Sequence, residues 1–218
     1  MSVRWRQTFL LIGPVLRIVP WVPVAAAVLV SALALLPAVA DAQAPASQVW
    51  GLRIAAVVLG AAASFAMVDP MALLSVTPTP RWLRQWLRVT VALVPAAAVW
   101  CCLYAAAASS AAPQRLPLGD LVAEAAVCAL AGVVGAAVAA RGGHSLTTAV
   151  AGPAAQGGLM AATLFLPASY SAWPLPGAAQ WETAHDWWWA ALVVLVVALV
   201  AANGEVWPWR VRRAGAGG

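Results

Sequence analysis

Long apolar runs separated by short connections constrain this chain more than any other feature. Each run has roughly the 20 residues that a helix needs to cross a bilayer. None shows the alternation of a half-buried strand, and lipid leaves only helices or closed barrels as spanning structures. We therefore predict an all-α integral membrane protein, a single transmembrane domain with six transmembrane helices. The predicted spans cover residues 21–40, 52–68, 86–107, 119–140, 147–166 and 187–203.

The composition agrees with a membrane protein and argues against a nucleic-acid-binding one. Hydrophobic residues make up 64% of the chain and charged residues 9%, whereas soluble domains are about half apolar and a quarter charged. The net charge is +5. All twelve basic residues are arginine, and most lie at the ends of apolar runs. Topology and anionic lipid headgroups explain them better than nucleic acid does, so we expect a multi-pass protein of the plasma membrane.

The arginines also predict the orientation of the chain. With the N-terminus inside, ten of the twelve arginines fall in inside segments, and Arg53 and Arg115 fall outside. Loops rich in arginine stay on the cytoplasmic side. Six spans with both termini cytoplasmic follow, and residues 1–20 are expected to form an interfacial amphipathic helix before the first span.

The end of the first run has a second interpretation. Ala38-Val39-Ala40 resembles the cleavage site of a signal peptide. However, about twenty residues with Arg4, Arg6 and Arg17 precede this run, which is long for a signal peptide. We therefore expect a first span.

The loop at 69–85 contains two helix starts. Asp69 can cap a helix whose first residue is Pro70, and a short apolar helix through Ser75 follows. Residues 77–80 interrupt it, because a residue before proline avoids helical geometry. Thr79-Pro80 then starts a second helix that continues into the third span. Either the loop is a topological anchor only, or its apolar helix docks into a groove of a soluble partner.

The second helix places charge and aromatic side chains on neighbouring faces. Arg81, Arg84 and Arg88 share one face, and Trp82 and Trp86 share the next. Such a helix begins at the membrane surface with arginines toward phosphates or water and tryptophans toward lipid.

This layout resembles the membrane subunits of ABC-2-type transporters. Those subunits have an N-terminal interfacial helix, six spans and a coupling helix in the loop after span two. The segment DPMALLSVTPTPRWLRQWLR is similar to the DP…TPTP…R pattern of small actinobacterial permeases of this kind. Residues 167–186 would then supply the short re-entrant or interfacial piece between spans five and six. The candidate coupling residues are Asp69, Pro70, Met71, Leu73, Leu74, Thr77, Pro78, Thr79, Pro80 and Arg81.

The resemblance implies a permease subunit of an exporter, driven by a separate cytoplasmic P-loop ATPase. The chain has no G-x-x-x-x-G-K-[ST] motif and no lysine. ATP and Mg²⁺ would therefore be bound by the partner, and this chain would be neither an enzyme nor a holder of cofactors. A second permease subunit, of the same or a similar chain, would complete the pathway. The alternative is a non-transporting accessory or structural membrane protein.

Two polar side chains inside predicted spans are candidates for a pathway. Glu124 follows Asp120 by one turn, and it either lies near the outer headgroups within reach of water or contacts a substrate or proton. Gln156 follows Pro153, and it either pairs with freed backbone groups and packs helices or lines a pathway. Few charges elsewhere favour an apolar or amphipathic cargo.

Small residues recur at helical spacing in two spans. They are Gly60 with Ser64, and Gly132 with Gly135 and Ala136. This spacing indicates tight helix contacts or dimerisation.

The sequence contains no residue pattern typical of a metal site or of a catalytic nucleophile. His144 and His185 are expected in opposite loops, and the three cysteines, Cys101, Cys102 and Cys128, fall in apolar runs. We therefore predict no metal site and no Ser/His/Asp arrangement.

Overall fold

The computed structural model describes residues 13, 16–17, 19–40, 45–68, 81–110, 116–142, 145–167 and 170–204. These residues form helices and turns, with no strand among them. The predicted interfacial helix at 1–20 lies almost entirely outside the described residues, and the predicted coupling segment at 69–80 lies wholly outside them. The helices are α2 (Trp21–Ala40), α3 (Pro45–Ser64), α4 (Arg81–Ser110), α5 (Leu118–Ala139), α6 (Ser145–Leu164) and α7 (Trp181–Asn203), with 3-10 turns η1 (Phe65–Met67) and η3 (Ala140–Gly142).

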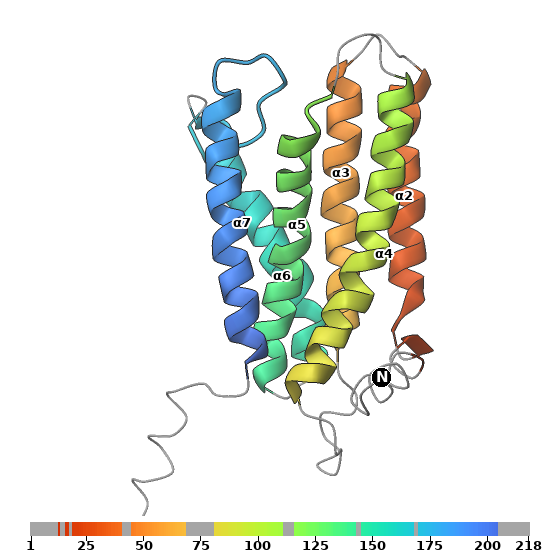
Figure 1. The fold of residues 1–218 in the computed structure, drawn as a ribbon, viewed down its shortest axis with the longest axis vertical. Coiled ribbons are helices and arrows are strands. Elements are labelled where there is room, and N and C mark those ends of the chain that lie inside the picture. The colour runs from red at the N-terminus through yellow and green to blue at the C-terminus, as the bar shows by residue number, and fades with distance from the viewer. Residues whose placement is uncertain are drawn as a thin grey trace, which may run out of the picture.

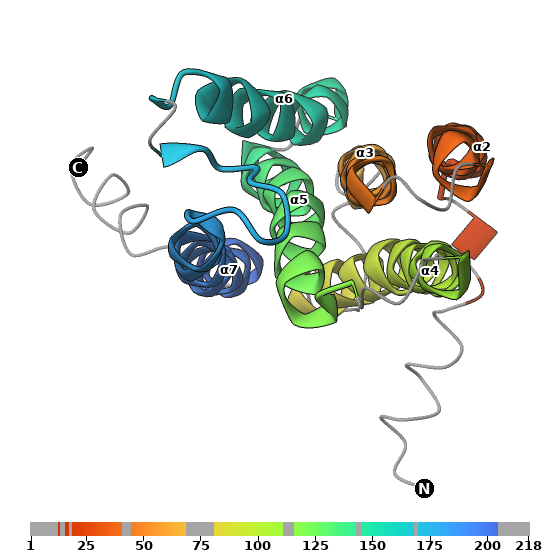
Figure 2. The ribbon, with the colours of Figure 1, turned by 90° about the horizontal axis from the view of Figure 1, so that it is seen from above.

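The described helices run alternately up and down in an antiparallel bundle (Figure 1). We call the end where α3, α5 and α7 begin the upper end, and the end where α4 and α6 begin the lower end. Seen from above, α5 is central and packs against α3, α6 and α7 (Figure 2). Helices α2 and α4 pack against α3, and α4 also contacts α7.

Among the described residues, four helical segments are long and apolar enough to cross a membrane, namely Ala46–Met67, Trp82–Ser110, Leu118–Gly142 and Trp181–Asn203. Helix α2 has a shorter apolar stretch, Trp21–Pro37. Helix α6 is not among the four, because Gln156, Pro153 and several glycines dilute its apolar residues. The all-helical fold is thus confirmed, and it is compatible with a multi-pass membrane protein.

Helices α3 and α7 begin six or seven residues before the predicted spans. Helix α3 begins at Pro45 rather than at 52, and α7 begins at Trp181 rather than at 187. Proline is favoured at the first helical position, and acidic residues such as Glu182 are favoured in the first turn. The prediction counted Arg53, at the edge of span two, with the outside segments and placed His185 in a loop, whereas the fold buries both inside the bundle.

Glycines allow α3, α5 and α6 to cross closely. A Cβ added at Gly60 would lie 2.9 Å from the Ala129 Cα and the Cys128 carbonyl oxygen of α5. One added at Gly152 of α6 would lie 2.3 Å from Ser64 Oγ of α3. The small residues that the sequence analysis singled out in α3 and α5 therefore serve helix contacts within the chain.

Arginines at the lower end cap helix C-termini. Arg88 donates to the carbonyl oxygens of Ala66 and Val68. Arg141 donates to those of Ala201 at 2.7 Å, Ala202 at 2.8 Å and Gly204 at 2.7 Å. These carbonyls lack partners within their own helices, and a cation also suits the helix dipole there. Arg88, predicted to face phosphates or water, is only 4% exposed.

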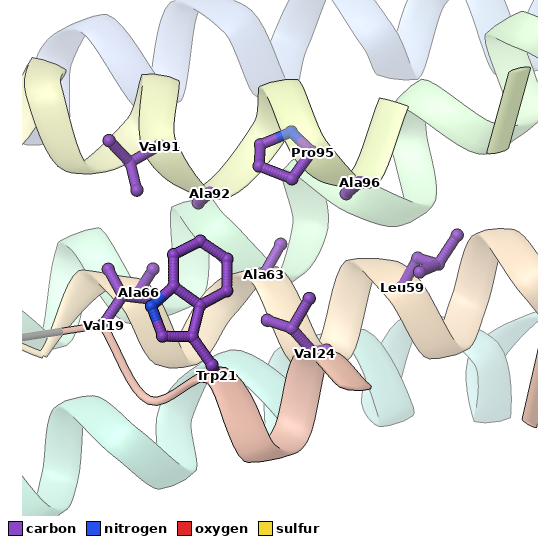
Figure 3. Close-up of a pocket in the computed structure, with 11 residues that line it drawn as sticks. Val19, Trp21, Val24, Leu59, Ala63, Ala66, Val91, Ala92, Pro95 and Ala96 are labelled. Atoms are coloured by element: carbon purple, nitrogen blue, oxygen red, sulfur yellow. The ribbon is translucent and has the colours of Figure 1, made fainter. Parts of the chain in front are cut away.

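The Trp21 side chain fills the space where α2, α3 and α4 meet near the lower end (Figure 3). Its indole lies opposite Val91, Ala92 and Pro95 of α4, and its Nε1 donates to the Leu16 carbonyl at 2.9 Å. Only about 10 Å³ remains free beside it. This contact holds the beginning of α2 against the two helices that follow it.

Candidate functional site

Three ionisable side chains from three helices meet inside the upper half of the bundle. They are Arg53 of α3, Glu124 of α5 and His185 of α7, and each is at most 3% exposed. At 1.5 Å per residue they lie about 12, 9 and 6 Å along their helices from the upper end. The three helices begin at the same end of the bundle, so these positions fall at a similar depth. We call them the buried ion cluster.

Glu124 is the centre of the buried ion cluster. Its Oε2 accepts from Arg53 Nε at 2.8 Å, and its Oε1 accepts from Arg53 Nη2 at 2.7 Å. This is a two-point guanidinium–carboxylate pair, the strongest common geometry for such a contact. His185 Nε2 lies 3.0 Å from Glu124 Oε1. The carboxylate thus links α3, α5 and α7.

Arg53 also holds the connection between α6 and α7. Its Nη1 donates to the Trp173 carbonyl at 3.2 Å, and its Nη2 donates to the Pro174 carbonyl at 2.8 Å. The guanidinium carbon lies 5.3 Å from the ring centroids of both Trp50 and Trp173, within the range of a cation–π contact. One side chain therefore satisfies Glu124 and ties the loop to α3.

Tryptophans of the α6–α7 loop and α7 bind this loop over the buried ion cluster. Trp173 Nε1 donates to Thr163 Oγ1 at 2.9 Å, and Trp188 Nε1 donates to the Ala172 carbonyl at 2.9 Å. The Trp173 and Trp188 rings lie 4.7 Å apart. The described part of this predicted re-entrant piece has turns at 170–180 and then enters α7. The loop folds inward between α5, α6 and α7 (Figure 2), so it covers the cluster at the upper end.

Trp181 and Asp120 make a second contact between α5 and α7. Trp181 Nε1 donates to Asp120 Oδ2 at 2.8 Å. The Trp181 ring lies 4.1 Å from the ring of His185. Asp120 is thus placed one turn above Glu124, and its negative charge adds to the field around the cluster.

An unpaired buried charge is expensive, and in a membrane ionisable groups usually face the bundle or a cavity and pair with each other. Each donor nitrogen of Arg53 has a partner here. The buried ion cluster is therefore a stable lock between three helices and a loop. It offers a proton site and a charged pair but no activated nucleophile. In the part of the chain that the structure describes, no three His, Cys, Asp or Glu side chains are grouped to hold a metal.

An apolar cavity of about 280 Å³ lies beside the buried ion cluster, between α3, α4 and α5. Ala56, Trp100 and Ala125 line this cavity and also lie against the Arg53–Glu124 pair. Its other walls are apolar as well, including Leu93 of α4 and Leu130 of α5. A molecule in this cavity would have hydrocarbon around it and the charged pair behind one wall.

The two pathway candidates from the sequence occupy different sites. Glu124 lies in the buried ion cluster, and at 2% exposed it is not in contact with water. Gln156 is also buried, and its Nε2 donates to the Val57 carbonyl of α3 at 2.6 Å. Because Val57 follows Arg53 by one turn, α5 and α6 bind α3 at successive levels. Of the coupling candidates, only Arg81 falls within the described residues, as the first residue of α4.

Sequence reasoning missed Arg53 and His185. Arg53 was assigned to an outside segment and His185 to a loop; the loop assignment is wrong, since His185 lies in α7. The available signal was charge pairing. Glu124 is the one acid well within a predicted span, and an intramembrane acid needs a cation, for which Arg53 at the edge of span two is the nearest candidate.

The chain matches no family model, no curated protein and no solved structure. Its function is therefore argued from the bundle, the buried ion cluster and the cavity.

Proposed function

We propose that this chain is the membrane-spanning permease subunit of an ABC transporter, driven by a separate cytoplasmic ATPase. In this proposal all six long helices cross the membrane, and the lower end is cytoplasmic. The alternating helix directions support an even number of crossings. The lower end also carries Arg88 and Arg141, in agreement with the excess of arginine on cytoplasmic loops.

The observation that carries the transport proposal is the attachment of the α6–α7 loop at the upper end by the buried ion cluster. Charged groups inside membrane helices are retained mainly where they serve a pathway, a gate or a proton. Here Arg53 joins α3 to α5 and to the α6–α7 loop. Moving the loop outward requires breaking these contacts together, as expected for a gate with two discrete states.

The apolar cavity supports a particular class of cargo. Its walls of alanine, leucine and tryptophan provide hydrophobic contact and few hydrogen bonds. An apolar or amphipathic molecule, such as a lipid or a hydrophobic peptide, fits this chemistry better than a sugar or an ion. The direction of transport in this proposal is export, following the family resemblance of the sequence.

The ATPase part of the proposal depends on the sequence at 69–80. The short capped helix predicted there, with Leu73 and Leu74, has the pattern of an apolar segment that docks into a groove of a partner. The stiff Thr77–Pro80 connection would transmit movement of this segment to α4. A second permease subunit would complete the complex.

Two observations favour a second candidate, an accessory or structural membrane protein. Each donor nitrogen of Arg53 has a hydrogen-bond partner in the buried ion cluster, and the glycine crossing packs α3, α5 and α6 tightly. Both features also suit a rigid subunit that stabilises a larger complex and does not open.

Purification from the native cells in mild detergent, followed by mass spectrometry, tests the proposal. We would compare the tagged wild-type chain with Leu73→Asp and with a matched control, Leu146→Asp. Leu146 is exposed near the beginning of α6 at the lower end, so its variant adds the same charge to the same end of the bundle.

We expect a P-loop ATPase to co-purify with the wild type and with Leu146→Asp and to be lost with Leu73→Asp. Equal recovery with Leu73→Asp would reject docking at 69–75. Absence of any ATPase from the wild-type sample, under conditions that keep other ABC complexes intact, would reject the permease proposal and favour the accessory protein.

A further inference from the structure

Both ring nitrogens of His185 lie close to oxygen acceptors. Nδ1 is 2.7 Å from the Trp181 carbonyl oxygen, and Nε2 is 3.0 Å from Glu124 Oε1. A carbonyl oxygen can only accept, so Nδ1 must carry a proton. A neutral imidazole has one N–H only. Its Nε2 would then present a lone pair to the oxygen of Glu124.

A second proton, on either Glu124 or His185, allows a hydrogen bond between Nε2 of His185 and Oε1 of Glu124. If Glu124 is ionised, His185 must be an imidazolium that donates from Nε2. If His185 is neutral, Glu124 must be a carboxylic acid that donates from Oε1. Both arrangements contain the same number of protons. With the Arg53 guanidinium, the buried ion cluster then has a net charge of +1 in either case.

The surroundings of the buried ion cluster suit a net positive charge. The carbonyl oxygens of Trp173, Pro174 and Trp181 point at Arg53 or His185. The faces of Trp50 and Trp173 lie over the Arg53 guanidinium, and aromatic faces attract cations. The single carboxylate of Glu124 does not neutralise both Arg53 and His185. The carbonyl oxygens and aromatic faces compensate the remaining positive charge.

The titratable neighbours of the Glu124–His185 pair lie on α3, α5 and α7. Arg53 faces the pair from α3, and Asp120 and Cys128 lie one turn on either side of Glu124 on α5. On α7 itself, the described acids Glu182 and Asp186 are exposed. Asp120 accepts a hydrogen bond from Trp181, whose ring lies 4.1 Å from the ring of His185.

We infer that Glu124 and His185 together bind one proton at neutral pH, and that this proton fixes α7 and the α6–α7 loop against α5. Loss of the proton to water at the upper end leaves a carboxylate facing a bare nitrogen across 3.0 Å. The contact becomes repulsive, so α7 and the loop lose one of their attachments to α5. Since the closed form holds one proton more than the open form, closure weakens as the pH rises.

Magnetic resonance on the histidine ring and infrared spectroscopy on the carboxyl group test this inference together. The sample is the full chain in lipid vesicles with ¹⁵N-labelled histidine, in a His144→Ala background that leaves His185 as the only histidine. The two spectra are recorded over a pH series across neutrality. The readout involves no ATPase and no cargo, so its result is independent of the proposed transport function.

We expect, at neutral pH, either a His185 ring with both nitrogens protonated or a protonated Glu124 carboxyl group. Raising the pH should remove that one proton and leave a neutral ring. A bare ring nitrogen together with an ionised Glu124 at neutral pH would overturn the inference.

Variants assign the proton to the pair. Glu124→Gln should lose the doubly protonated ring and the carboxylic acid band at neutral pH, whereas Glu182→Gln, an equal charge change on the exposed side of α7, should keep the wild-type signal. An imidazolium that persists in Glu124→Gln would show that the proton does not depend on the pair, and would overturn the inference. The wild-type pH series remains decisive if Glu124→Gln fails to fold.

Discussion

Replacing Arg53 by methionine tests whether the buried ion cluster holds the bundle together. Methionine keeps an unbranched side chain of similar reach but removes the charge and every donor. The change deletes both contacts to Glu124 and both contacts to the α6–α7 loop. Arg53 and Glu124 are 3% and 2% exposed, so water cannot replace the lost partner.

The expected loss of stability follows from this burial. Removing one member of a buried pair costs about 3–5 kcal/mol, because the remaining charge is left uncompensated. His185 still contacts Glu124, so we expect the lower part of that range, about 3 kcal/mol. Glu124→Leu should have an effect of similar size, since it leaves the Arg53 charge facing only carbonyls and indole rings.

The double variant separates the pair from the packing around it. With both charges gone, apolar side chains fill the site, and such replacements are often close to neutral. We therefore expect Arg53→Met/Glu124→Leu to be more stable than the sum of the single losses predicts, by at least about 2 kcal/mol. Glu182→Gln, exposed in the first turn of α7, is the control and should change stability by less than about 0.5 kcal/mol.

Reversible unfolding in mixed micelles, with SDS as denaturant and tryptophan fluorescence as signal, measures these differences. The chain has thirteen tryptophans, several of them around the buried ion cluster. Single losses below about 1 kcal/mol, or losses that simply add in the double variant, would refute the reasoning, because both results are incompatible with a tight buried pair.

Two further predictions concern the packing of the helices. Gly60→Ala should lower the free energy of unfolding by about 1–3 kcal/mol, because its Cβ would meet the α5 backbone. The control is Gly158→Ala, where a Cβ meets nothing within 4 Å. This variant should be neutral or stabilising in the same SDS titration. Arg141→Gln should lower the local stability of the lower end of α7 by about 1–2 kcal/mol, because its contacts with the carbonyl oxygens are lost. Amide hydrogen exchange at 201–204 should then become faster. Unchanged exchange there would show that water caps the helix equally well.

The sequence alone determined the helical character of the chain and the approximate place of each helix. Apolar runs of bilayer length without alternation leave few other folds, because backbone groups in lipid must bond within helices or closed barrels. The predicted 21–40 and 119–140 lie close to α2 (Trp21–Ala40) and α5 (Leu118–Ala139). Local spacing also identified the small residues at which α3 and α5 pack.

The local sequence pattern did not predict helix boundaries near polar residues. A polar residue at the end of an apolar run is typical of a loop. Only its burial in the folded bundle shows that it belongs to the helix. Arg53 and His185 lie within α3 and α7 because partners from other helices satisfy them. Nothing in the residues around 53 or 185 specifies those partners.

Only the tertiary structure decided how the site is assembled. Glu124 was a candidate from its position in an apolar run, but its partners are 71 and 61 residues away in sequence. They meet because α3, α5 and α7 begin at the same end of an antiparallel bundle and place their early turns at one depth. The α6–α7 loop completes the site through backbone carbonyls, whose direction no side-chain pattern encodes. Pairing of charges in a low-dielectric interior is thus a property of the packed bundle, whereas helix formation in apolar runs is a property of the sequence itself.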